Sequence, residues 1–292
     1  MKTKRSGKLL SRGLAVLLLV SFFVGCGQVR AEKKPVNTAY NYRDLVVQKN
    51  LDDYNPASEA TVTVNGVTYT GTYAETTQPF LQQCNSDVYH TYKGDGFSFS
   101  IGADDKKFQE LTLHTEKQDT CTFNKLECRK VADAIADDYI SLDEYTVSYV
   151  AYDEHYHYFE YCREVSGFKT FDRMLVGFDC NGDLKQVVLY LLGAFENVKS
   201  VKISEQIAQK ALEESSRKNY LENYPDSGKA DLIRVQIDSA EYLTMTDAQQ
   251  CALRVFFQSG LTTEYGEDGD IGGYILTAFV IADHTKRNWF KP

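Results

Sequence analysis

The Asn65-Gly66 dipeptide is the feature that most narrows what this chain can fold into. It joins two four-residue runs, 61–64 and 67–70, in which threonine alternates with valine or tyrosine. A two-residue type I′ turn needs positive φ at both central positions, and Asn-Gly adopts those angles readily. The segment is therefore predicted to form a β-hairpin, and Asn181-Gly182 predicts a second one.

Two helices are predicted among the strands. Asn124 followed by Glu127 is a capping-box arrangement, with asparagine in place of serine or threonine. Behind this cap, apolar residues recur at three- and four-residue spacing: Cys128, Val131, Ala132, Ile135 and Tyr139. A second apolar stripe follows Ser204. We expect helices near 124–140 and 204–220.

The order of strand, polar connector and capped helix recurs along the chain. The apolar spacing of residues 108–113 returns 76 positions later in 184–189. We therefore expect an α+β fold of tandem antiparallel β-sheet units, with one packed helix introducing each of the last two. The expected parts are a signal peptide at 1–26, a tether at 27–58, an N-terminal β unit at 59–122 and αβ units at 123–198 and 199–292.

The N-terminus is typical of an exported protein. A basic start precedes an apolar run, 14–24, that is too short to span a bilayer, which takes about 20 residues. Phe23-Val24-Gly25-Cys26 then resembles the lipobox of bacterial lipoproteins, which implies that Cys26 carries lipid at the outer face of the cell membrane. Phe23 departs from the usual leucine of that motif, and cleavage after Ala31, which would release a soluble protein, is the alternative.

The negative charge of the exported chain limits the kinds of partner that it can bind. Removing the five cations before Cys26 takes the formal charge from −9 to −14. Phosphate backbones and anionic head groups repel such a protein. Nucleic acid is excluded as a partner on this ground, and any membrane attachment is expected to come from the lipid anchor.

Six cysteines follow Cys26, and none forms a C-x-x-C pair. They are Cys84, Cys121, Cys128, Cys162, Cys180 and Cys251. The spacing does not support a zinc knuckle or a redox motif. Disulfides in an oxidising compartment and buried free thiols both remain open.

Residues 124–190 carry a resemblance to a known family. A capped helix, two aromatic strands and a closing strand with Phe178, Asp179, Gly182 and Leu184 resemble a PepSY-type domain. The segment 199–292 matches this pattern more weakly. The resemblance implies a non-catalytic module that inhibits peptidases or holds partner proteins in check.

Two other functions compete with that reading. His155 and His157 are expected on one side of a strand and could hold zinc, which would make the chain a secreted metal-dependent hydrolase. A third ligand at fixed spacing is missing, and the aromatic neighbours favour a packed sheet. The 20 tyrosines and 16 phenylalanines could form a glycan-binding surface, although Trp289 is the single tryptophan.

The sequence therefore favours a protein-binding module over an enzyme. We expect a chain that binds or restrains an envelope or secreted protein, with a peptidase as one candidate partner. No catalytic, cofactor-binding or metal-binding residue is assigned, and Cys26 is the predicted lipidation site.

Overall fold

The computed structural model describes residues 39–40, 47–79, 87–114, 122–152, 155–201, 205–226, 228–245, 251–261 and 274–281. The chain divides into two units, Met1–Glu32 and Lys33–Pro292, and all described residues belong to the second. Cys26 and the rest of the expected signal peptide and lipobox lie outside the described residues.

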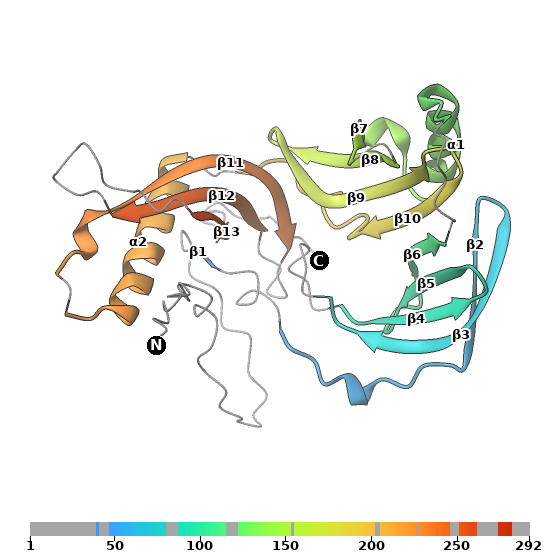
Figure 1. The fold of residues 1–292 in the computed structure, drawn as a ribbon, viewed down its shortest axis with the longest axis horizontal. Coiled ribbons are helices and arrows are strands. Elements are labelled where there is room, and N and C mark those ends of the chain that lie inside the picture. Colours follow the sequence, from blue (N-terminus) through green and yellow to red (C-terminus); the bar gives the residue numbers. More distant parts are fainter. Residues whose placement is uncertain are drawn as a thin grey trace, which may run out of the picture. The chain divides into compact units, whose positions relative to one another are not determined.

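The described part of the chain is built mainly from strands (Figure 1). Its strands are β1 Ala39–Tyr40, β2 Glu59–Val64, β3 Val67–Thr77, β4 Tyr89–Gly94, β5 Phe97–Gly102, β6 Phe108–Leu113, β7 Thr146–Ala151, β8 Tyr156–Val165, β9 Phe168–Asp179, β10 Leu184–Tyr190, β11 Ile233–Met245, β12 Cys251–Leu261 and β13 Tyr274–Ile281. Its two α-helices are α1 Lys125–Asp137 and α2 Glu205–Asn223, and its short 3-10 turns are η2 Leu51–Asp53, η3 Leu142–Glu144 and η4 Ala230–Leu232.

All of these strands belong to one sheet. Its main path runs β1-β13-β12-β11-β9-β10-β6-β5-β4-β3-β2, and β8 and then β7 branch from β9. Neighbouring strands are antiparallel except β9 and β11, which pair in parallel through Lys169 with Tyr242 and Thr170 with Leu243. The sheet is therefore almost entirely antiparallel.

This continuous sheet shows that the expected α+β architecture of tandem units is wrong. Strand β6, from the expected N-terminal unit, pairs with β10 of the next through Leu111 and Val187. The two segments that share the apolar spacing are thus neighbours in one sheet and not equivalent parts of separate sheets. An isolated unit would leave unpaired backbone groups along its edge strands, and pairing across the expected boundaries satisfies them.

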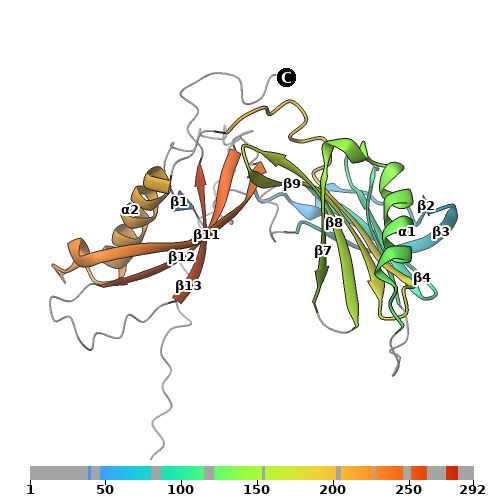
Figure 2. The ribbon, with the colours of Figure 1, turned by 90° about the horizontal axis from the view of Figure 1, so that it is seen from above.

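The larger hydrophobic core contains residues from strands on both sides of the β6–β10 pairing. Buried residues of β2, β4, β5 and β6 pack in the same cluster as residues of α1, β8, β9 and β10, including Phe99, Leu111, Ile135 and Phe159. A second cluster contains Ala208 and Leu212 of α2, Leu253 of β12 and buried neighbours. Helix α1 lies beside strands β7–β9, and α2 beside β11 and β12 (Figure 2).

The two predicted hairpins are present. Asn65 and Gly66 have φ of 51° and 75°, as a type I′ turn requires, and β2 and β3 pair in unbroken register around them. At the second site β9 and β10 pair around the turn, but only Gly182 has a positive φ, of 88°. The dipeptide thus identified both hairpins but not the geometry of the second turn.

The predicted helices are also present, close to the expected positions. Asn124 caps α1, because its side-chain oxygen accepts from the N–H groups of Leu126 and Glu127 at 3.1 and 3.3 Å. The predicted apolar stripe of α1 included one residue too many, since Val131 is 39% exposed whereas Ile135 is fully buried. No helix in the described ranges is both long enough and apolar enough to cross a membrane.

Candidate functional site: a tyrosine patch on strands β7 and β8

The strand β8 separates a buried aromatic row from an outward one. Phe159 and Tyr161 point toward α1 and are buried, whereas Tyr156 and Tyr158 take the opposite face because side chains alternate along a strand. Tyr161 donates a hydrogen bond to Asp133 of α1 at 2.6 Å, which identifies the helix side of the sheet. The sequence correctly indicated a packed aromatic sheet for the inner row only.

The outward row forms an exposed cluster that we call the tyrosine patch: Val150, Tyr152, Tyr156 and Tyr158. Tyr152 is 74% exposed, and Val150 and Tyr156 are each 39% exposed. The rings of Tyr152 and Tyr158 meet edge to face, with centroids 5.3 Å apart. The ammonium group of Lys185 lies 5.4 Å from the centroid of the Tyr156 ring. The patch thus combines large aromatic surface with one flanking cation.

A cross-strand glycine makes room for the ring of Tyr158. Gly177 lies opposite it on β9, and a Cβ built at Gly177 would fall 2.6 Å from Cε1 of Tyr158. The ring therefore occupies space that only a glycine leaves open. Burial raises the pKa of Tyr190, Arg173 opposes the rise, and the nearby hydroxyl of Tyr158 adds to it.

One end of the outward face is covered by a buried charge cluster around Glu160. This carboxylate accepts from Arg173 at 2.8 Å and from the hydroxyl of Tyr242 on β11 at 3.1 Å, and it pairs with Lys169. Burial by itself would raise the pKa of Glu160, but the hydrogen bonds and charges of Lys169 and Arg173 outweigh it and hold the pKa below its usual value. The guanidinium of Arg173 also lies 4.5 Å from the centre of the Tyr242 ring.

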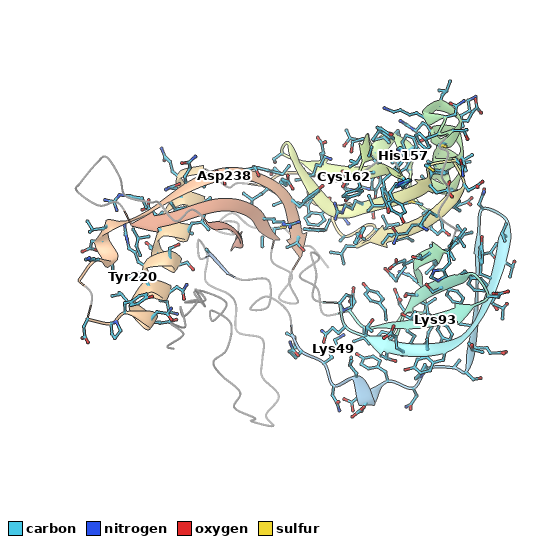
Figure 3. The ribbon with its side chains drawn as sticks, viewed as in Figure 1. Lys49, Lys93, His157, Cys162, Tyr220 and Asp238 are labelled. Atoms are coloured by element: carbon cyan, nitrogen blue, oxygen red, sulfur yellow. The ribbon has the colours of Figure 1, made fainter. Side chains whose placement is uncertain are left out.

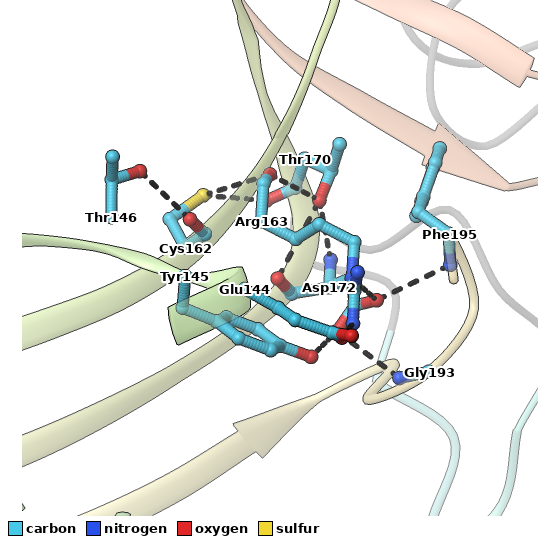
Figure 4. Close-up of polar contacts among 9 residues, drawn as sticks. All are labelled: Glu144, Tyr145, Thr146, Cys162, Arg163, Thr170, Asp172, Gly193 and Phe195. Atoms are coloured by element: carbon cyan, nitrogen blue, oxygen red, sulfur yellow. Dashed lines mark hydrogen bonds and ion pairs between the residues drawn. The ribbon is translucent and has the colours of Figure 1, made fainter. Parts of the chain in front are cut away.

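A second buried carboxylate, Asp172, lies in the first half of β9 (Figure 4). Its oxygens accept from the hydroxyl of Tyr145 at 2.6 Å, from Nε of Arg163 at 3.0 Å and from the backbone N–H groups of Gly193 and Phe195 at 3.1 and 3.3 Å. Burial raises the pKa of Tyr145, and its hydrogen bond to Asp172 adds to the rise. With four donors around a fully buried side chain, this cluster joins β8 and β9 to the loop after β10.

The two histidines that were considered as metal ligands do not both lie on a strand. His155 precedes β8, so it does not share a strand face with His157. His157 lies on β8 (Figure 3). Its ring stacks on Phe123 with centroids 3.8 Å apart, and its Nδ1 lies 2.8 Å from the hydroxyl of Tyr149. Its Nε2 is buried and has no hydrogen-bond partner among the described residues. Nor do those residues contain three or more metal-binding side chains close enough to hold an ion.

The four cysteines that the structure describes are free and buried: Cys128, Cys162, Cys180 and Cys251. Burial raises the pKa of both Cys162 and Cys251 to about 12, which disfavours the reactive thiolate. These side chains behave as small hydrophobic residues. Cys84 and Cys121 lie outside the described residues.

Sequence reasoning missed both buried carboxylates and the tyrosine patch. Asp172, Glu160 and Arg173 look like ordinary polar residues of a strand, because the groups that cover them come from distant segments. The patch did have a local signal. Tyr156 and Tyr158 alternate along the sequence with His157 and Phe159, which places the two tyrosines on one face of a strand.

Comparisons with known proteins found a distant structural similarity to this chain. No protein-family model matches it, and no curated protein matches it significantly. Among solved structures, the Bacillus megaterium YpeB C-terminal domain is similar at 10% sequence identity and a TM-score of 0.31. That match covers 61% of this chain and 74% of the other. The similarity is distant and supports no inference about function.

Proposed function

We propose that this chain is an exported, non-catalytic protein-binding module, anchored by lipid on Cys26 at the outer face of a bacterial membrane. Its partner is an envelope or secreted protein that it binds or restrains, and a secreted peptidase is the candidate we favour. The PepSY-type pattern of residues 124–190 supports this choice of partner.

The observation that carries the proposal is the exposure of the tyrosine patch. Tyrosine is enriched in the central parts of protein interfaces, where its ring supplies buried area and its hydroxyl finds a hydrogen bond. Tyr152 leaves 74% of its surface in solvent, although a buried ring would contribute to stability. Exposed apolar surface that gathers in one place is typical of an interaction site.

Attachment to the membrane would assist such a module. Two proteins held at one surface meet at a raised effective concentration, so that modest affinity in solution gives high occupancy at the membrane. The negative charge of the chain is compatible with this geometry, because the acyl chains provide the attachment and no basic surface is needed.

The proposal is tested by mixing the purified full chain with the secreted peptidases of its own organism. Complex formation is measured by sedimentation, and cleavage of a peptide substrate is measured in parallel. Tyr152→Ser removes the most exposed ring of the patch and is expected to weaken the complex by about tenfold or more. Tyr224→Ser is the matched control, because Tyr224 is 55% exposed, directly follows α2 and lies outside the patch.

Stable complexes with slowed cleavage, lost in Tyr152→Ser and kept in Tyr224→Ser, support the proposal. Equal binding by both variants contradicts the assignment of the patch. Failure to recover any complex, together with intrinsic hydrolysis that disappears in the His155→Ala protein, overturns the proposal in favour of a hydrolase.

A further inference from the structure

Strand β7 forms an edge of the sheet next to the tyrosine patch. It pairs with β8 on one side, and no other strand in the described part of the chain pairs with it. Natural edge strands usually carry charged residues, prolines or bulges that block further pairing. The residues of β7, Thr146–Ala151, include no charge and no proline, and their register with β8 is unbroken over six pairs.

One hydrogen bond shows which backbone groups of β7 point away from β8. The N–H of Tyr152 donates to the carbonyl of Tyr156 at 3.1 Å, so these residues form a hydrogen-bonded pair. Such pairs alternate with non-hydrogen-bonded pairs along an antiparallel ladder. It follows that the N–H and C=O groups of Val147, Tyr149 and Ala151 point away from β8.

We propose that β7 accepts an extended segment of the partner protein as an added strand, with apolar side chains at alternate positions of that segment. This inference rests on the proposed function and specifies how the partner binds. A row of unpaired donors and acceptors at strand spacing is complementary to another extended backbone.

The side chains along β7 define the rest of this segment. The outward-facing residues of the bound segment lie beside Val150 of the tyrosine patch, and those on the other face lie beside Val147 and Tyr149. Because neighbours across a strand pair contact one another, apolar residues on the outward face bury the patch. A second copy of this chain is disfavoured as the occupant, because each copy carries a formal charge of −14 from Cys26 onward.

The probe for this mode of binding is a set of fluorescent octapeptides that are apolar at alternate positions. Binding to the purified full chain is measured by fluorescence anisotropy, and the tightest peptide is then N-methylated at one amide at a time. In strand addition, every second backbone N–H of the peptide donates a hydrogen bond to β7. Methylation is therefore expected to weaken binding by about tenfold at alternate amides and to have little effect at the others.

Variants of the protein provide an independent arm. Ala151→Pro removes an exposed edge N–H and leaves the bonds to β8 in place, and it is expected to weaken peptide binding by about tenfold or more. Thr61→Pro is the matched control on the edge strand β2. Thr61 is exposed, and the register with Thr70 around the hairpin turn directs its N–H away from β3.

A period of two in the methylation series, together with loss of binding in Ala151→Pro but not in Thr61→Pro, supports strand addition. Uniform effects of methylation, unchanged binding in Ala151→Pro, or no binding by any octapeptide overturn it. If Ala151→Pro binds normally while Tyr152→Ser does not, strand addition is wrong and the proposed function stands. Self-association that Ala151→Pro abolishes would identify a second copy as the occupant and also overturn the inference.

Discussion

The ring of Tyr158 occupies the space that a side chain at Gly177 would need. The two residues face each other across β8 and β9, and a Cβ at Gly177 would lie 2.6 Å from Cε1 of Tyr158. The position of one ring of the tyrosine patch therefore depends on a residue that has no side chain.

Gly177→Ala is expected to displace Tyr158 and to destabilise the fold by about 1–2 kcal/mol through overpacking. Partner binding should weaken, because the displaced ring no longer meets Tyr152. Urea unfolding and sedimentation measure the two effects. In the double-mutant cycle with Tyr158→Ala, the glycine substitution should cause little further loss of stability. Additive effects in that cycle would show that the two residues do not interact.

Ile135→Asp is expected to destabilise the protein by about 3 kcal/mol or more, because it places a charge without a partner in the larger core. Ile135 is fully buried on α1. Ala134→Asp adds the same charge at the neighbouring, exposed position and should change stability by about 0.5 kcal/mol or less. Equal melting temperatures for the two variants would mean that α1 does not pack through this face.

Glu160 should make stability depend on pH in acid. Its pKa in the folded protein is lower than the usual value of 4.5, so the folded state favours the charged carboxylate. The resulting stabilisation is present above pH 4.5 and is lost as the pH falls through the lowered pKa. Urea unfolding across this range should show a large deficit for Glu160→Gln near neutral pH, where Lys169 and Arg173 lose their counter-charge. The deficit should shrink in acid, and a constant difference would contradict this account.

Cys26→Ala is expected to abolish labelling by a radioactive fatty acid and to slow processing of the precursor. The measurement is acyl labelling followed by fractionation into membrane and medium. The alternative, cleavage after Ala31, predicts a different result. Normal cleavage and release into the medium for both the wild type and the variant would show that Ala31 is the site used.

Local elements of the fold were predictable because their signals are local. The Asn124 cap gave the start of α1, and the Asn65-Gly66 pair gave the first hairpin with its φ angles. The partners of distant strands were not predictable. Apolar alternation in 108–113 and 184–189 is equally compatible with two strands of one sheet and with strands of two separate sheets. The prediction of two separate sheets was wrong.

The candidate site was less predictable than the fold. Alternation along β8 places Tyr158 and Phe159 on opposite faces of the sheet. It does not say which of the two faces another element covers. The same limit applies to Glu160. Its burial depends on Tyr242, 82 residues later, and no pattern near Glu160 indicates that contact.

The pairing of β6 with β10 has a consequence for how the chain acquires its structure. Gln186 of β10 donates to Glu110 of β6, 76 residues earlier. Contacts between such distant positions form slowly, because a long loop must close before they contribute. Until β10 has emerged from the ribosome, β6 lacks its partner strand and the hairpins before it keep one sheet edge open. Delivery of residues 184–190 thus marks the earliest moment at which the N-terminal half can become resistant to proteases and aggregation.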